Sequence, residues 1–195
     1  MKRILIYFLI VLLTSLCSCN LFQTRTPEEP NENSSNFPPA TTPQTLVDNF
    51  TKSINQKNIA IYQNCLIQNI SLFKFYPSAD AFSIYSNIFQ NWNLNSEITF
   101  ARNLFSKFSN QESPEFIVNN PSFSSYSTDS TVFVADYELV INSKDNSINN
   151  SYQGTVQLVL VLDNSGLWKI AKWFDFRKQT DSFQTISFLK AKLNS

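Results

Sequence analysis

Two stretches decide the fold: residues 131–142, TVFVADYELVIN, and residues 152–162, YQGTVQLVLVL, which both read as long strands. In each stretch large apolar side chains recur at every second position, the period of a strand with one buried face. Residues 163–166, DNSG, have the composition of a hairpin turn. Residues 167–177, LWKIAKWFDFR, are expected to form the closing strand. The second half of the chain therefore predicts an antiparallel sheet.

The closing strand carries apolar residues in both of its alternating sets, and two interpretations stay open. In the first, the sheet is covered on both faces near its middle. In the second, a β-bulge at residues 171–172 turns Trp173 to the same side as Ile170. Asp175 and Arg177, two positions apart on one face, predict a surface ion pair that contributes little stability.

Before Pro114 the apolar residues recur at intervals of three or four, which predicts helices. The first helix begins sharply, because the Thr42 hydroxyl can cap a helix whose first residue is Pro43. The other expected elements are helices near residues 61–66, 78–92 and 95–108, short strands at 71–76, 116–119 and 122–126, and a last amphipathic helix at 183–193. This order predicts an α+β fold, with the N-terminal helices packed on one face of a strongly curved antiparallel sheet.

The composition excludes several classes of function. The chain has no histidine, the commonest general base and metal ligand, so a Ser-His or Cys-His nucleophile is also excluded. Only two glycines are present, which excludes a Gly-rich phosphate loop. The balance of 15 basic and 15 acidic residues gives no positive excess for nucleic acid. We expect no metal, no cofactor and no nucleic-acid partner.

The N-terminus reads as an export signal. Lys2 and Arg3 precede an apolar run at residues 4–16, ILIYFLIVLLTSL. A helix of that length spans about 20 Å, less than the roughly 30 Å of a bilayer core, which suits a signal peptide better than a stable span. Residues 16–19, LCSC, resemble the bacterial lipobox, which implies cleavage before Cys19 and attachment of lipid to it. An uncleaved N-terminal anchor is the alternative.

Three segments follow from this interpretation. Residues 1–18 are the lipoprotein signal peptide. Residues 19–41 hold the lipidated Cys19 and a tether rich in Pro, Asn and Ser, a composition that buries too little to fold. Residues 42–195 form a single domain. We expect a lipid-anchored protein of the cell envelope, on the periplasmic face or the outer membrane. Cys65 is the one thiol that such a mature chain retains within its domain, and its apolar helical neighbours indicate a buried structural cysteine.

The domain resembles the NTF2-like superfamily, the cone of nuclear transport factor 2 and ketosteroid isomerase. The resemblance rests on an opening helix pair at 46–66 that ends near an aromatic strand, on the long strand at 131–142, and on the final hairpin 166–170, GLWKI, followed by Trp173 and Asp175. A single such domain behind a Pro-rich tether also resembles bacterial lipoproteins.

This resemblance covers residues 42–177, and the helix at 183–193 is an extra C-terminal element. It implies a pocket at the wide end of the cone. Enzymatic members of the superfamily place an acid or a base there, often Asp or His with a Tyr donor.

Three residues are candidate catalytic groups: Asp136, Tyr137 and Asp175. If Asp136 faced the cone, desolvation would raise its pKa and make it a general base. However, Asp136 and Glu138 share one face of their strand, and burying both would cost several kcal/mol, which favours the solvated outer face. The alternative carboxylate for a lyase or isomerase is Asp175, acting with a Tyr.

Five large aromatic residues are candidates for lining a pocket that takes an apolar or carbohydrate ligand. They are Tyr62, Tyr85, Trp92, Tyr152 and Trp173. The alternative is that they are core.

Three functions remain at this stage: a non-enzymatic module that binds a ligand or a protein partner, a cone-type lyase or isomerase, and a dimeric interaction scaffold. The lack of histidine, of metal-ligand spacing and of a nucleophile motif favours the binding module.

Overall fold

The computed structural model describes residues 37–142, 148–178 and 182–194. The predicted signal peptide, Cys19 and the predicted tether up to residue 36 lie outside these residues. In the part of the chain that is described, no helix is both long enough and apolar enough to span a bilayer.

Contacts with the domain begin before Thr42. The Pro38 carbonyl accepts a hydrogen bond from Asn49 Nδ2 at 2.7 Å, and the Ala40 carbonyl accepts one from the Trp168 N–H at 2.8 Å. Residues 38–40, which the sequence assigns to the tether, therefore pack against the domain.

The first two helices are α2 (Pro43–Asn55) and α3 (Ile59–Cys65). The predicted start of α2 is confirmed, because Thr42 Oγ1 accepts a hydrogen bond from the Thr45 N–H at 3.1 Å and Pro43 occupies the first turn. Cys65 is buried, and burial raises the pKa of its thiol to about 12. A thiol in this state is not a nucleophile at neutral pH, in agreement with a structural role.

Helices α4 (Ala79–Phe89) and α5 (Leu94–Ser106) follow a short edge strand, β1 (Lys74–Tyr76). Helix α5 begins slightly earlier than predicted, because Asn93 and Ser96 form a capping box at its N-terminus. Ser78, which precedes α4, makes no side-chain capping bond, and its hydroxyl instead lies 2.8 Å from Thr185 Oγ1. This contact joins the start of α4 to the C-terminal part of the chain.

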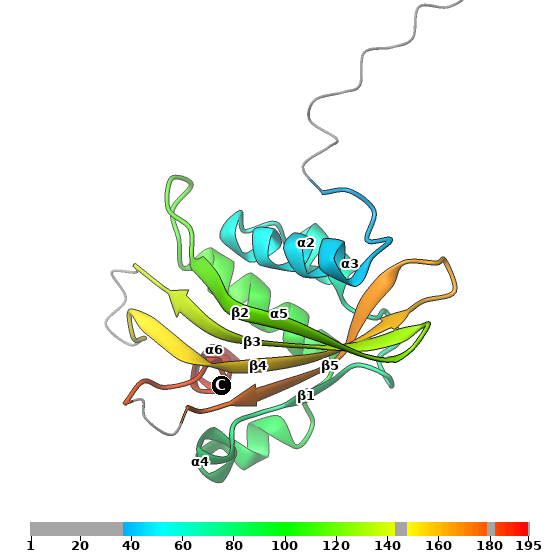
Figure 1. The fold of residues 1–195 in the computed structure, drawn as a ribbon. Coiled ribbons are helices and arrows are strands. Elements are labelled where there is room, and N and C mark those ends of the chain that lie inside the picture. The colour runs from blue at the N-terminus through cyan, green and yellow to red at the C-terminus, as the bar shows by residue number, and fades with distance from the viewer. Residues whose placement is uncertain (1–36, 143–147, 179–181, 195) are drawn as a thin grey trace, which may run out of the picture. The chain divides into compact units, whose positions relative to one another are not determined.

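The sheet has the order β1-β5-β4-β3-β2 (Figure 1). Its other strands are β2 (Glu115–Ser127), β3 (Ser130–Val140), β4 (Ser151–Leu162) and β5 (Trp168–Phe176). Strands β2 to β5 pair antiparallel, while β1 pairs parallel with β5. The two weak strands predicted in residues 116–126 belong to the single strand β2, whose register shifts between Asn119 and Ser122. The α+β class and the curved sheet are confirmed.

A β-bulge at Ala171 determines which side chains of the closing strand β5 face the interior. Val159 pairs with Lys172 whereas its neighbour Leu160 pairs with Ile170, so Ala171 is an extra residue in β5. Ile170 and Trp173 are consequently both fully buried on the inner face. The bulge interpretation is therefore the correct one of the two.

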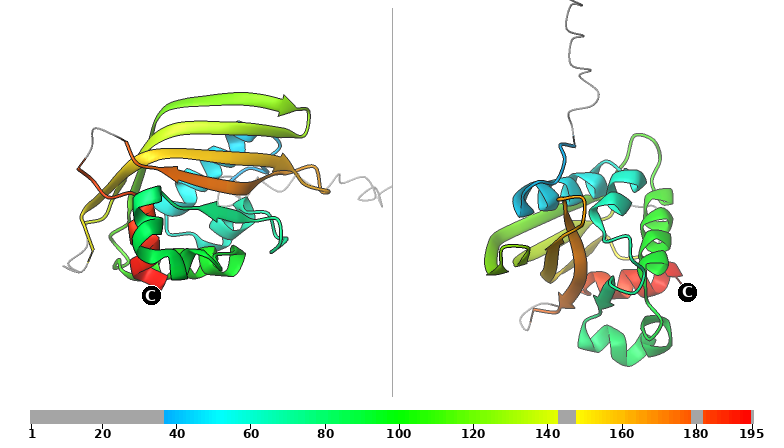
Figure 2. Two further views of the ribbon diagram at one scale, coloured as in Figure 1. Left: turned by 90° about the horizontal axis from the view of Figure 1, so that it is seen from below. Right: turned by 90° about the vertical axis from the view of Figure 1, so that its right-hand side faces the viewer.

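Helix α6 (Ile186–Asn194) closes the domain. It packs against α4 and α5, and Figure 2 shows it as the red helix lying between them. It starts three residues later than the predicted 183, and Phe183 is 44% exposed. In contrast, Ser187 and Lys190 on this helix are completely buried. The face that α6 turns inward is therefore partly polar.

Candidate functional site

The structure brings Asp175 and Tyr137 together. Asp175 lies on β5 and Tyr137 on β3, with β4 between them, and Tyr137 Oη donates a hydrogen bond to Asp175 Oδ1 at 2.7 Å. Gly154 of β4 pairs with Tyr137 in the ladder and leaves room for its ring. A Cβ atom at Gly154 would lie 2.8 Å from Tyr137 Oη and 2.6 Å from the Phe176 carbonyl oxygen. The glycine thus allows the phenol to cross β4.

The remaining bonding capacity of this pair is taken up by α6. Asp175 Oδ2 accepts hydrogen bonds from Ser187 N–H at 2.9 Å and from Ser187 Oγ. Tyr137 Oη accepts one from the Ile186 N–H at 2.8 Å. These two N–H groups belong to the first turn of α6, where a carboxylate is favoured by capping and by the helix dipole. The pair therefore caps the N-terminus of α6.

Asp175 is 1% exposed. Burial raises its pKa, although hydrogen bonds from Ser187, Tyr137 and Thr185 oppose that change. Burial also raises the pKa of Tyr137 well above its ordinary value, and the Asp175 charge adds to this. The two residues have the composition of an acid–tyrosine pair, and Asp175 is also one of the residues that line the open cleft described below.

Asp136 lies on the opposite face of β3. It accepts a hydrogen bond from Thr155 Oγ1 at 2.9 Å and forms an ion pair with Lys178 Nζ at 3.0 Å. Its slight burial raises the pKa of this carboxyl, but the bonds from Lys178 and Thr155 outweigh that and leave the pKa below its ordinary value. Glu138 accepts hydrogen bonds from Ser151 and Gln153 on the same face. Both carboxylates thus lie on the outer face of the sheet, where Asp136 is paired with Lys178 and Glu138 is held by neutral donors.

A second buried polar cluster joins α5 to α6. Lys190 Nζ lies 2.5 Å from Glu97 Oε1, and both side chains are fully inaccessible to solvent. Tyr62 Oη also donates to Glu97 Oε1 at 2.6 Å, and Trp92 Nε1 donates to Glu97 Oε2 at 2.8 Å. The helix predicted at 95–108 places Glu97 in its first turn, but the sequence pattern does not single out Lys190.

The Lys190 ammonium is also enclosed by aromatic faces. Nζ lies 3.6 Å from the centroid of the Trp173 ring and 3.8 Å from that of Phe75. The rings of Phe100 and Trp92 lie at 5.1 and 5.6 Å. All four are within the range of a cation–π attraction. Burial lowers the pKa of Lys190 to about 8, against the opposing charge of Glu97. We call this cluster the ammonium box; it comprises Glu97, Tyr62, Phe75, Trp92, Phe100 and Trp173.

The five predicted pocket residues are distributed between this box and other places. Tyr62, Trp92 and Trp173 belong to the box and surround Lys190. Tyr152 is buried, and its hydroxyl accepts a hydrogen bond from the Asn149 N–H at 2.9 Å. Tyr85 packs edge-on against Phe188 of α6, with ring centroids 6.1 Å apart. The side chain of Lys190 thus lies among the three box residues.

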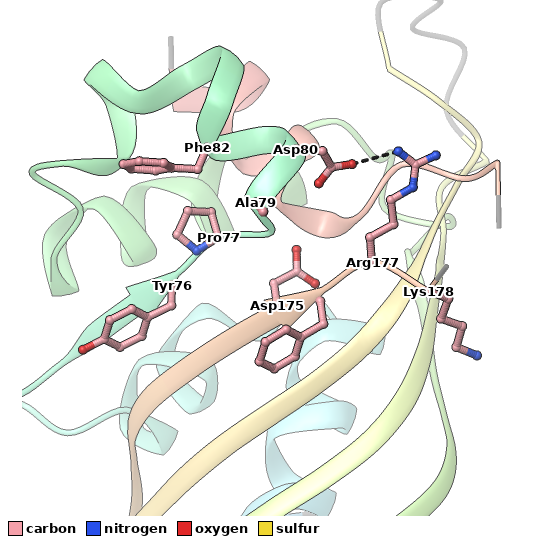
Figure 3. Close-up of a pocket in the computed structure, with 9 residues that line it drawn as sticks. Tyr76, Pro77, Ala79, Asp80, Phe82, Asp175, Arg177 and Lys178 are labelled. Atoms are coloured by element: carbon pink, nitrogen blue, oxygen red, sulfur yellow. Dashed lines mark hydrogen bonds and ion pairs between the residues drawn. The ribbon is translucent and has the colours of Figure 1, made fainter. Parts of the chain in front are cut away.

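An open cleft lies outside the cone, at the edge formed by β1, β5 and the start of α4 (Figure 3). Its volume is about 730 Å³. Tyr76 of β1 lies on one side of the cleft and Phe82 of α4 on the other. Phe176 also lines it, and Tyr76, Phe82 and Phe176 are each more than a third exposed. Arg177 Nη1 contacts Asp80 Oδ2 at 3.0 Å at one end of the cleft. The surface ion pair expected between Asp175 and Arg177 is therefore wrong, because Asp175 points inward and Arg177 pairs with Asp80.

The described residues contain no group of three or more His, Cys, Asp or Glu side chains that could hold a metal ion. The candidate site thus consists of an interior with two buried polar clusters and an open, mainly apolar cleft on the outside, which Asp175 also lines.

Comparison with known proteins identifies the fold. No protein-family model and no curated protein matches the chain. Among solved structures, a candidate aromatic ring hydroxylase from Novosphingobium aromaticivorans matches with a TM-score of 0.53 and 14% identity, over 75% of this chain and 92% of that protein.

Two further solved structures give similar matches. An NTF2-like superfamily protein from Salmonella enterica matches with a TM-score of 0.50 and 12% identity, over 70% of this chain and 89% of that one. The beta subunit of benzoate 1,2-dioxygenase from Burkholderia mallei matches with a TM-score of 0.50 and 13% identity, over 71% and 92%. Structural matches at such low sequence identity establish only that the fold is shared, and proteins of one fold perform many different functions.

Proposed function

We propose that this chain, an NTF2-like domain whose interior is closed by α6, is a non-enzymatic binding module. We also propose that lipid on Cys19 holds it at a membrane of the cell envelope. One observation carries the non-enzymatic part. The groups inside the cone that could act as acid or base, namely Asp175, Tyr137, Glu97 and Lys190, are bonded to one another or to α6 and are at most 2% exposed.

A general acid or base must come within about 2.6–3.2 Å of the proton that it transfers. Here both oxygens of Asp175 already hold donors at such distances, from Tyr137 and Ser187. Glu97 is bonded to Tyr62, Trp92 and Lys190 in the same way. A substrate inside the cone would have to displace α6 first. Several of the matching solved structures have the names of enzymes, but a shared fold does not imply a shared activity.

The outer cleft is the binding site that we assign to this module. Its exposed rings Tyr76, Phe82 and Phe176 present apolar faces, and the Arg177–Asp80 pair supplies hydrogen-bonding groups at one end. Ligand sites combine a mainly apolar lining with a few polar groups that fix orientation. The cleft therefore suits a small ligand with an apolar face, such as a sugar ring or an aromatic glycoside.

Saturation-transfer NMR with phenyl β-D-glucopyranoside, on the full chain in detergent, tests this site. We expect transfer to the phenyl and sugar protons in the unaltered protein and its loss in Phe82→Ala. Ile84→Ala is the matched control, because Ile84 is an exposed apolar residue of the same helix that does not line the cleft. Equal transfer in both variants, or none in the unaltered protein, contradicts the assignment.

The membrane anchor is tested by radiolabelled palmitate and cell fractionation. We expect Cys19→Ala to lose the label and leave the membrane fraction. Cys17→Ala is the matched control, because it removes a cysteine of the same signal and should keep both label and location. Label that persists in Cys19→Ala, or that disappears in Cys17→Ala, contradicts lipidation at Cys19.

A cone-type lyase or isomerase is the second candidate, and the 2.7 Å contact between Tyr137 and Asp175 favours it. Such an enzyme requires that α6 leaves the pair. Hydrogen exchange of the Ile186 and Ser187 amides decides this point. Exchange much faster than that of β3 and β4 supports the enzyme, and equally slow exchange opposes it.

The dimeric interaction scaffold stays a prediction. Sedimentation of the full chain at high concentration tests whether it forms a dimer.

A further inference from the structure

The ammonium box has the form of a ligand-binding site that is already filled. Its rings, its carboxylate and its phenol come from α3, α5, β1, β5 and the turn before α5, whereas the cation comes from α6. We propose that the box is a binding site for small primary alkylammonium ions, and that Lys190 is the ligand that the chain supplies to it.

The contacts of Lys190 Nζ define the selectivity of the site. The nitrogen donates to Glu97 Oε1 at 2.5 Å, which requires an N–H group. It also lies against the Trp173 and Phe75 rings at 3.6 and 3.8 Å from their centroids. A quaternary ammonium has no N–H, and its methyl groups hold the charge farther from a ring face. A neutral alcohol leaves the Glu97 charge without a counterion. The box therefore favours a primary ammonium over both.

Helix α6 does not depend on Lys190 alone to stay in place. The N-terminus of α6 is held by Asp175, which accepts from Ser187 N–H at 2.9 Å. Near its C-terminus, Asn103 Nδ2 donates to the Leu193 carbonyl at 2.6 Å, and Asn194 Nδ2 donates to the Ser96 carbonyl at 2.9 Å. Trimming Lys190 to Ala therefore leaves a cavity under a helix that is fixed at both ends.

The atoms removed by Lys190→Ala are three carbons and the ammonium nitrogen, which together have the size of n-propylammonium. The charge of Glu97 stays buried in that cavity, and an unpaired buried charge destabilises the folded state strongly. An external ammonium ion that fills the cavity restores both the ion pair and the ring contacts. Binding should then appear as recovered stability.

The experiment is thermal and urea unfolding of full-length Lys190→Ala with n-propylammonium chloride, n-propanol or tetramethylammonium chloride, at matched ionic strength. A ligand that binds only the folded state, present at about ten times its Kd, lowers the unfolding equilibrium constant about tenfold. We expect this change with n-propylammonium alone. Lys192→Ala, which trims a lysine of the same helix, should show no such response, and neither should Lys190→Met, which fills the cavity with an apolar chain.

If Lys190→Ala is unfolded in buffer, the titration is run in sucrose, which favours the compact state. Recovery of folding by n-propylammonium then supports the site, and failure to recover overturns it. An equal effect of n-propanol or of tetramethylammonium also overturns it, because the box would then lack selectivity. The same response in Lys192→Ala shows a general solvent effect and overturns it as well.

Discussion

An Asp175→Asn substitution tests whether this carboxylate holds α6 to the sheet. The carboxylate accepts hydrogen bonds from Tyr137 Oη, Ser187 N–H and Ser187 Oγ. An Asn side chain has one oxygen and one NH2 group, so it can accept from Tyr137 or from the Ser187 amide but not from both. At least one buried donor then loses its acceptor, which costs about 1–3 kcal/mol, and the surviving bonds lose their charge assistance. Relief from burying a charge offsets part of this, so we expect a loss of about 2–3 kcal/mol.

The loss is measured by urea unfolding at pH 7 with tryptophan fluorescence, which reports on the buried Trp173 and Trp92. Asp48→Asn is the matched control, because the Asp48 side chain is exposed and accepts only from Gln44 among the bonds described. A surface change of that kind should stay within about 0.5 kcal/mol. Equal stability of the two variants would refute the reasoning that Asp175 is a structural cap.

A double-mutant cycle extends the test to the acid–tyrosine pair. Tyr137→Phe removes the hydroxyl that links Asp175 Oδ1 to the Ile186 N–H. Residues within one buried hydrogen-bond network couple by about 0.5–3 kcal/mol. We expect the double variant to lose less stability than the two single losses together. Additive losses would mean that the two residues support α6 independently.

Three further outcomes are expected. Gly154→Ala should lower the melting temperature in thermal unfolding, because its Cβ would meet the Phe176 carbonyl at 2.6 Å; an unchanged melting temperature would count against the close crossing. Burial lowers the pKa of Lys190 from 10.5 to about 8, so between these values the unfolded chain binds a proton that the folded chain does not. The Lys190 side chain should therefore raise the free energy of unfolding by about 3 kcal/mol between pH 8 and 10.5. Urea unfolding at several pH values measures this rise, which should be absent in Lys190→Met. Trp173→Ala should lose about 3–5 kcal/mol in urea unfolding, because the ring is fully buried, and a loss below 1 kcal/mol would contradict its place in the core.

Local patterns in the sequence predict those parts of the fold that local chemistry determines. Strand β3 follows from the alternation in residues 131–142, and α2 follows from Thr42 and Pro43. The bulge at Ala171 could be inferred because apolar residues change sides there, so that no regular strand buries both Ile170 and Trp173. The sequence predicts Asp175 as an acid that acts with a tyrosine, but it does not indicate that this tyrosine is Tyr137.

The two polar clusters could not be predicted in this way, because their partners are distant in the chain. Glu97 has the position of a helix-start acid, and Lys190 has that of a solvated lysine; only their mutual contact, 93 positions apart, makes burial of either charge tolerable. One signal was available: Lys190 lies on the same helical face as Ile186 and Leu193, an apolar setting for a lysine. The late start of α6 has a similar cause, since its cap is provided by other strands.

The position of α6 also constrains when the domain can be completed during synthesis. Ser78 bonds to Ser187 across 109 positions, and β1 pairs with β5, the last strand. Loops of this length close slowly, and the first of these contacts cannot exist before residue 187 has been made. Until α6 has been made, the rings of Phe75, Trp92, Phe100 and Trp173 lack the Lys190 side chain that lies among them. A nascent chain that ends before Ile186 therefore exposes the apolar side chains that α6 covers, and exposed surface of this kind promotes aggregation.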